Sequence, residues 1–149
     1  MLLAIATGQR RSDLCSMHYT DVYDNYLHVI QDKTSAKVAI PLSLTLPQLG
    51  VSLETIINLY RSPNDVFLLT TNRRMAPCPA YASYAFEEAK SLAGIMKNTS
   101  LHECRSLAER LYSAINVNTR LLLGHTSWKM TDMYHNDRGL SKDTFNYVY

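Results

Sequence analysis

The sequence predicts one α+β domain, mainly α, in which helices surround a small three-stranded antiparallel sheet. The chain has 149 residues, 46% of them apolar and 19% charged, which is enough to bury one core. Apolar residues recur at helical spacing in several segments, and two β-rich runs flank the polar stretch "DKTSA". No repeat, low-complexity tract or linker interrupts the sequence, so we expect a single domain over residues 1–149.

Cap and turn residues set the expected ends of the elements. Gly8 and Gly124 each stop a helix, because glycine tolerates the left-handed backbone conformation found there. Ser52 is a good N-cap, and Ser100 forms a capping box with Glu103. The predicted helices are 2–7, 13–18 (capped by Ser12), 53–61, 80–96, 101–113, 118–123 and one capped by Ser127 that runs to Tyr134; the predicted strands are 26–31, 37–42 and 65–70.

Two of the helical segments should bury different amounts of surface. In 53–61, four apolar side chains recur at i, i+3, i+4 and i+7, the spacing of a core stripe. In 80–96, alanines and tyrosines occupy one side, while Glu87, Glu88 and Lys90 lie mostly on the other. We therefore expect few site residues in 80–96.

Charge and cysteine content limit the classes of function. The formal net charge is only +2, so any contact with nucleic acid must come from a local patch. Cys15, Cys78 and Cys104 include no CxxC pair, so the sequence indicates neither a disulfide framework nor a zinc site, and a cytoplasmic location is expected. The apolar start ahead of Gln9 is too short for a signal segment or membrane span. Because it is already apolar at Met1, we expect a preceding segment to be missing, although a short native helix would look the same.

Three short segments contain residues that could bind a phosphate. "TGQRRSDL" combines a glycine turn and two arginines with Asp13, which could hold a guanidinium in a bidentate pair. "LHECRS" places His102 and Arg105 one turn apart near a helix start, where free N–H groups favour anions. "LLGH" places His125 directly after a glycine helix stop. Each segment alone is equally compatible with ordinary packing or solvated charge.

Taken together, these segments resemble the tyrosine recombinases, the phage integrase family, and most closely its lambda-type integrases. The family pattern has an arginine in a "TGxR" box, a lysine in a β-ribbon, an HxxR box, an "LGH" box, and a tyrosine nine residues after the last histidine. The resemblance covers nearly the whole chain, including "KVAIPL" after the lysine. The six positions are filled in order by Arg10, Lys33, His102, Arg105, His125 and Tyr134.

The resemblance implies a domain that breaks and rejoins DNA without a metal or nucleotide cofactor. Tyr134 would attack a phosphodiester and form a 3′-phosphotyrosyl bond, which the 5′-hydroxyl of another strand can reverse. Arg10 and Arg105 would hold the two non-bridging oxygens, because planar guanidiniums with paired donors suit that geometry.

The resemblance also implies roles for the remaining site residues. Lys33 would protonate the leaving 5′-oxygen, His102 would assist removal of the tyrosine proton, and His125 would hydrogen-bond the phosphate. Asp13 and Glu103 are supporting candidates that could orient the arginines.

Residues next to the motif positions have simpler interpretations. Arg11 is expected to contact the DNA backbone or to remain an ordinary surface residue. Lys37 is interpreted as a solvated strand charge. His18, His28 and His135 match no motif position and are expected to be ordinary surface or hydrogen-bonded histidines.

The implied partners are double-stranded DNA and other integrase protomers in a synaptic complex, with no membrane association. After residue 144, Phe145, Tyr147 and Tyr149 alternate as on one side of a strand. This segment could pack against its own domain or a neighbouring protomer, or it could be a frayed tail.

Two alternatives remain open at the level of sequence. Full-length family members carry upstream DNA-binding domains, and this chain is expected to be the catalytic domain without them and without its first helix. The chain could therefore be a non-catalytic remnant that binds DNA or protein. A hydrolytic nuclease built on His102 and Arg105 would need a metal site or a water-activating base, and neither is apparent.

Overall fold

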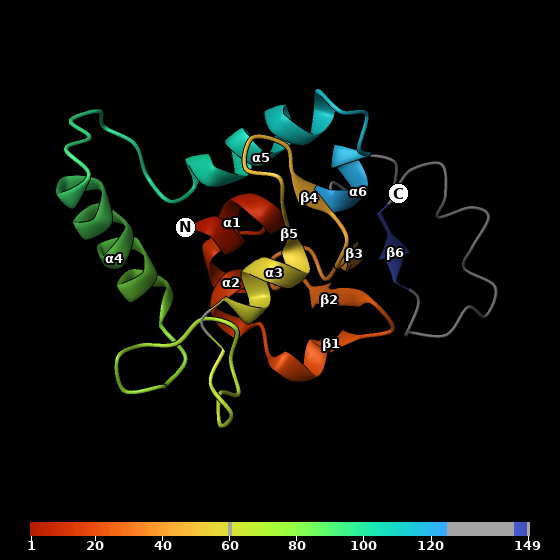
Figure 1. The fold of residues 1–149 in the computed structure, drawn as a ribbon, viewed down its shortest axis with the longest axis horizontal. Helices are drawn as coiled ribbons and strands as arrows, with labels where there is room; N and C mark the ends of the chain where they lie inside the picture. The colour runs from red at the N-terminus through yellow and green to blue at the C-terminus, as the bar shows by residue number, and fades with distance from the viewer. Residues whose placement is uncertain (60, 125–144, 149) are drawn as a thin grey trace.

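The computed structural model describes residues 1–59, 61–124 and 145–148, and it confirms the α+β class. Short helices pack around a twisted ribbon, and one longer helix stands on a flank (Figure 1). The elements are α1 (Leu2–Thr7), α2 (Arg11–Ser16), a 3₁₀ turn (Tyr19–Asp21), β1 (Val22–Tyr23), β2 (Tyr26–Ile30), β3 (Lys37–Pro41), β4 (Thr45–Leu46), β5 (Val51–Ser52), α3 (Leu53–Asn58), α4 (Pro79–Leu92), α5 (Glu103–Ser113), α6 (Thr119–Leu123) and β6 (Asn146–Tyr147).

The main sheet has the strand order β1-β2-β3-β6. β1, β2 and β3 are antiparallel, and the β2–β3 ribbon pairs Ile30 with Lys37 at the end that carries the turn. The predicted strands 26–31 and 37–42 are therefore confirmed. β6 adds a fourth strand, parallel to β3, and the N–H of Val148 donates to the carbonyl of Ala39 at 3.0 Å. The segment 145–148 thus packs against its own sheet.

The strand predicted over 65–70 is wrong. Phe67 forms only an isolated bridge with His18, and the Leu68 N–H donates to the Met17 carbonyl. The segment pairs with the described part of the chain only at this bridge, directly after α2, so it does not form the repeated backbone hydrogen bonds of a strand. Val66, which a strand in this sheet would half-bury, is 56% exposed.

Several helix boundaries are confirmed, and others shift by one to four residues; the helices predicted to end at 61 and 96 end at Asn58 and Leu92. The hydroxyl of Ser52 accepts the Thr55 N–H and caps α3, as predicted. Ser12 is not a cap, because Arg10 is the last extended residue and α2 already begins at Arg11. The helix predicted from 101 begins at Glu103, after a turn over 100–102 closed by i→i−3 backbone hydrogen bonds.

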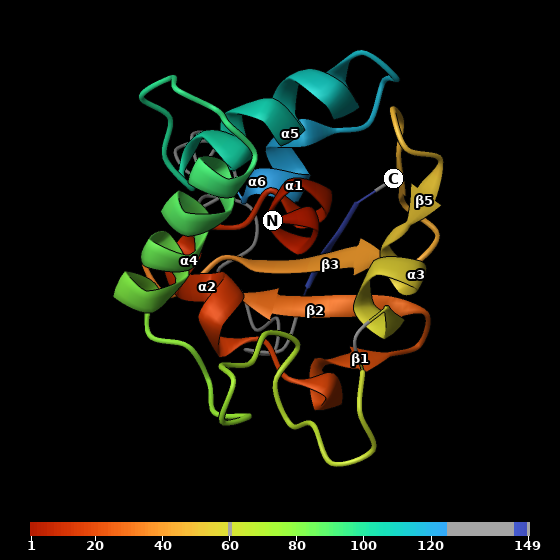
Figure 2. The ribbon, with the colours of Figure 1, turned by 60° about the vertical axis from the view of Figure 1, so that its left-hand side comes forward.

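The core lies where α1, α3, α5 and α6 meet the ribbon. Figure 2 shows α1, α5 and α6 grouped on the β3 side of the ribbon, and α1 contacts both α3 and α5. The Tyr112 side chain on α5 is fully buried, and its hydroxyl donates to the Ala6 carbonyl of α1 at 2.9 Å. By contrast, α4 has no buried residue and contacts the domain mainly through α2.

Gly8 is required at the end of α1 for two reasons, and both can be tested. Its φ is +64°, and a Cβ there would lie 2.7 Å from Leu123 Cδ2 and 3.3 Å from Ala108 Cβ. Gly8→Ala is expected to lower the free energy of unfolding by about 2–4 kcal/mol, measured by urea denaturation.

Gly50→Ala is the matched control, because Gly50 has φ +61° and a Cβ added there would meet nothing within 4 Å. It should cost only the backbone strain, about 1 kcal/mol. Equal losses for the two variants would contradict the packing argument at Gly8.

Candidate active site

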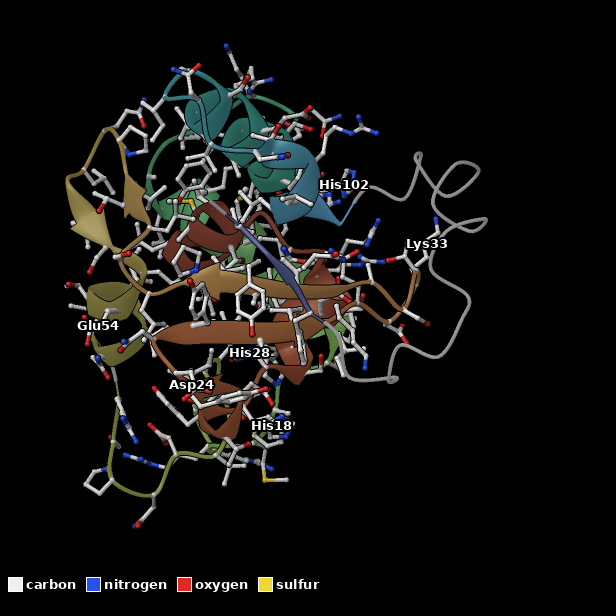
Figure 3. All side chains as sticks on the ribbon, turned by 90° about the vertical axis from the view of Figure 1, so that its right-hand side faces the viewer. His18, Asp24, His28, Lys33, Glu54 and His102 are labelled. Atoms are coloured by element: carbon white, nitrogen blue, oxygen red, sulfur yellow. The ribbon has the colours of Figure 1, made fainter. Side chains whose placement is uncertain are left out.

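One cleft brings together four of the residues singled out in the sequence: Arg10, Arg11, Lys33 and His102. They come from the α1–α2 junction, the ribbon turn and the turn before α5, so three distant parts of the chain converge. Lys33 and His102 face the same side of the molecule (Figure 3). The remaining lining residues are Gln9, Ser12, Ser83, Glu87, Ser100 and Leu101. A cleft lined by cationic groups and hydroxyls suits a phosphate.

Arg105 lies one turn after His102 but is buried, with 7% of its surface exposed. Its guanidinium donates to the carbonyls of Gly8 at 2.8 Å and Leu123 at 2.5 Å. These carbonyls belong to the ends of α1 and α6, where helices leave acceptors without intrahelical partners. Arg105 therefore ties together the segments "TGQR" and "LLGH".

The positive charge at this junction is only partly compensated. Burial, and after it the nearby charge of Arg10, lowers the pKa of Arg105, while Asp13 and Glu109 act in the opposite direction, and the net value is about 10. The guanidinium still carries its charge at neutral pH. Two cations that repel one another would both gain from an anion placed between them.

Arg10 donates a hydrogen bond to an amide, and Asp13 pairs with it only at ion-pair distance, so the bidentate pair suggested for Asp13 and a guanidinium is not formed with Arg10. Its Nη1 donates to Gln31 Oε1 at 2.8 Å, whereas Asp13 Oδ2 is 3.9 Å away. Asp13 is fully buried, and its Oδ1 accepts the Asp32 N–H at 2.9 Å, which turns the carboxylate toward the ribbon. Among the described residues, Oδ2 has no hydrogen-bond partner.

The other cleft residues are positioned by local contacts. Lys33 is exposed in a ribbon turn closed by backbone hydrogen bonds between Gln31 and the residues that follow Lys33. Arg11 is also exposed, and its Nη1 donates to Ser83 Oγ of α4 at 3.1 Å. The Glu103 carboxylate accepts the Ser100 N–H at 3.3 Å and so holds the turn that carries His102.

Three residues next to the motif positions lie outside the cleft. Lys37 is not the solvated charge we expected, because it is half-buried and its Nζ lies 5.6 Å from the Phe145 ring centroid. His28 is buried and stacks on Tyr23 at 3.7 Å between ring centroids. His18 lies 3.6 Å from the Asp21 carboxylate.

Two of the six motif positions, His125 and Tyr134, lie outside the described residues. The helix predicted to begin after Ser127 lies there too, as do Trp128, His135 and Tyr149. Gly124, directly before His125, ends α6 with φ +60°, as predicted.

Sequence reasoning missed the polar residues that support the cleft. Gln9 and Gln31 are buried amides, and Ser83 and Glu87 come from α4, where few site residues were expected. The only local signal is that the glutamines lie beside Arg10 and Lys33 in their motifs. No hydrophobic periodicity marks them.

Comparison with known proteins assigns the family. The family model described as the phage integrase family matches residues 1–139. The chain belongs to the phage integrase family. It is 39% identical over 151 aligned residues to an integrase of Enterobacteria phage P21, an alignment that covers 93% of this chain and 40% of that protein. It is 36% identical over 150 residues to the integrase of Escherichia phage lambda, covering 96% of this chain and 42% of that protein.

Solved structures of family members share this fold. A lambda integrase dimer bound to a COC′ core site matches with a TM-score of 0.78 and 34% identity, over 86% of this chain and 49% of that chain. The lambda integrase catalytic core matches with a TM-score of 0.74 and 36% identity, over 83% of this chain and 79% of that one. This chain spans about two fifths of the length of the curated integrases it matches.

The described part of the chain shows neither a membrane span nor a metal cluster. Within 1–59, 61–124 and 145–148, none of the helices has the length and apolar character needed to cross a bilayer. The same residues contain no group of three or more histidine, cysteine or acidic side chains arranged for a metal ion.

The buried Asp13 carboxylate should contribute to stability through its charge. Asp13→Asn keeps an oxygen for the Asp32 N–H but removes the negative charge beside Arg10 and Arg105. We expect a loss of about 1–3 kcal/mol in the free energy of unfolding, measured by urea denaturation at neutral pH.

Asp24→Asn makes the same chemical change at an exposed residue with φ +52°, a conformation that asparagine tolerates. Its stability should stay within about 0.5 kcal/mol of the wild type. A similar, small effect at Asp13 would show that its charge does not support the two arginines.

Proposed function

We propose that this chain is the catalytic domain of a site-specific DNA recombinase, an integrase that cleaves and rejoins DNA through a 3′-phosphotyrosyl intermediate on Tyr134. The observation that carries the proposal is the convergence of Arg10, Lys33 and His102 in one cleft beside buried Arg105. Family membership supports the same function.

In this proposal the two arginines stabilise the negative charge on the non-bridging oxygens of the scissile phosphate. The Tyr134 oxygen attacks in line, the P–O5′ bond breaks, and the new P–O(Tyr) bond retains the phosphodiester energy. Arg10 and Arg105 bind the two non-bridging oxygens, and their mutual repulsion is relieved when the phosphate enters. Arg10 can reach it because its side chain is 23% exposed at the cleft. Arg105 contributes charge from a fixed position.

Proton transfer falls to Lys33 and the histidines. The ammonium of Lys33, on the exposed ribbon turn, supplies a proton to the leaving 5′-oxygen, and His102 accepts the proton of Tyr134. His125 hydrogen-bonds the phosphate. No step in this scheme calls for a metal or nucleotide cofactor.

The proposed partners are double-stranded DNA and further protomers. Solved lambda integrases include a dimer bound to a core site and a tetramer bound to a Holliday junction. In this chain, 145–148 packs on its own β3, and we propose that the C-terminal segment can make the corresponding contact with a neighbouring protomer. We place the protein in the cytoplasm, where its three unpaired cysteines would remain reduced.

Covalent trapping tests the reaction directly. A suicide substrate, nicked so that the 5′-hydroxyl diffuses away, should accumulate a protein–DNA adduct at low salt. Tyr134→Phe should give none, while Tyr84→Phe, which alters a 64% exposed tyrosine on α4, should form the adduct normally. Denaturing gel electrophoresis measures the adduct. If wild-type protein forms none on cognate DNA, autonomous cleavage is wrong and a purely binding role takes its place.

DNA binding should depend on Arg11. Arg11→Ala is expected to weaken binding to duplex DNA roughly fivefold and to reduce the slope of log K against log [salt] by about one. Arg73→Ala removes an exposed arginine that does not line the cleft, and it should leave that slope unchanged. Fluorescence anisotropy at several salt concentrations measures both. Equal effects would show that the cleft is not the DNA-facing surface.

A further inference from the structure

A buried amide, Gln31, lies in the ribbon and connects it to the α1–α2 junction and to the end of α6. It follows β2, is fully buried, and uses all of its hydrogen-bonding capacity. Its Nε2 donates to Gln9 Oε1 at 2.7 Å and to the Leu123 carbonyl at 3.0 Å. Its Oε1 accepts from Arg10 Nη1 and from Thr34 Oγ1, both at 2.8 Å. An amide has two donors and two acceptor lone pairs, so no capacity is left over.

The surrounding groups allow only one orientation of this amide. Gln9 Nε2 donates to the carbonyls of Thr7 at 3.0 Å and Leu122 at 2.7 Å, so the Gln9 oxygen must face Gln31. If Gln31 were flipped, its oxygen would meet the Gln9 oxygen and the Leu123 carbonyl, and its NH₂ would meet the Arg10 guanidinium. Carbonyls at the ends of α1 and α6 therefore fix Gln9, Gln9 fixes Gln31, and Gln31 presents an acceptor to Arg10.

The space around Gln31 is equally constrained. A Cβ at Gly124 would lie 2.7 Å from both Nε2 and Oε1 of Gln31, so the amide lies against the glycine that ends α6. The Leu123 carbonyl at the end of α6 accepts hydrogen bonds from both Gln31 and Arg105. The same helix end therefore contacts Arg105 directly and Arg10 through Gln31. The backbone of Gln31 also closes the ribbon turn, because its carbonyl accepts the Ser35 N–H at 2.8 Å.

We propose that Gln31 is a positioning residue for Arg10, and this proposal rests on the proposed function. Its neutral oxygen fixes one Nη of the guanidinium without neutralising the charge, so the other N–H groups remain available to the scissile phosphate. The nearest carboxylate, on Asp13, is held off at 3.9 Å by its own bond to the ribbon. The Gln31 amide thus fixes the position of the Arg10 guanidinium relative to two other parts of the site: the ribbon turn that carries Lys33, and the end of α6.

Gln31→Met tests the proposal, since methionine keeps the volume and removes both ends of the amide. The rate of adduct formation on the suicide substrate should fall about tenfold or more, as expected for losing a hydrogen bond to a charged group. In an Arg10→Ala background the same change should alter the rate less than about twofold, because Gln31 acts through Arg10. An equal loss in both backgrounds would show a general structural role and overturn the proposal.

Tyr112→Phe is the matched control, because it removes another buried hydrogen bond, to the Ala6 carbonyl, away from the cleft. It should lower stability while leaving the rate per folded molecule near that of the wild type. If it slows cleavage as much as Gln31→Met does, loss of stability explains both variants and the positioning role is wrong.

A second measurement needs no catalysis and separates this proposal from the proposed function. In ¹⁵N-arginine-labelled protein, the Arg10 guanidinium should show hindered rotation and separate Nη signals, assigned by their loss in Arg10→Lys. Gln31→Met should average these signals, and Tyr112→Phe should preserve them. Signals that stay separate in Gln31→Met overturn the positioning role. A wild-type protein that forms no adduct overturns the proposed function, and the guanidinium signals still decide the role of Gln31.

Discussion

The structure depends on the way Arg105 satisfies the ends of two short helices. α1 has six residues and α6 has five, too few to be stable alone, and each ends in a left-handed glycine with carbonyls left to pair. The Arg105 guanidinium donates to Gly8 and Leu123, the end residues from which α2 and the "GH" segment continue. The same two hydrogen bonds therefore hold the ends of α1 and α6 together and position the motif segments that follow them.

This arrangement leaves a cluster of positive charge that the fold only partly compensates. Asp13 is buried beside Arg10, but its carboxylate is turned toward the ribbon, and the hydrogen-bond acceptors of both arginines are neutral oxygens. Neutral acceptors fix a guanidinium without cancelling its field. Burial, and after it the charge of Arg10, lowers the pKa of Arg105, so the free protein holds this guanidinium less favourably than water would. An anionic ligand would compensate the remaining positive charge.

The ribbon joins the candidate site to the end of the chain. Its turn carries Lys33 into the cleft, while β3 pairs with β6 along its free edge. Val148 is buried in the core, and Phe145 and Tyr147 both lie against His28. The predicted alternation is therefore confirmed for these two residues, while Tyr149 lies outside the described part of the chain. A change in where the C-terminal segment docks would therefore act on the ribbon directly.

The sequence by itself determined the features that depend on a few neighbouring residues. These include the glycine stops at Gly8 and Gly124, the Ser52 cap, the two ribbon strands and the motif positions. Only the tertiary structure decided that Arg105 is buried, that Gln31 and not Asp13 holds Arg10, that 65–70 is not a strand, and that β6 joins β3 in parallel. The physical reason is the sequence distance over which each interaction acts. Caps and left-handed turns depend on the sterics of a few neighbouring residues. The hydrogen bonds that join one segment of the site to another link residues 18 to 113 positions apart, and their partners meet only once the helices have packed.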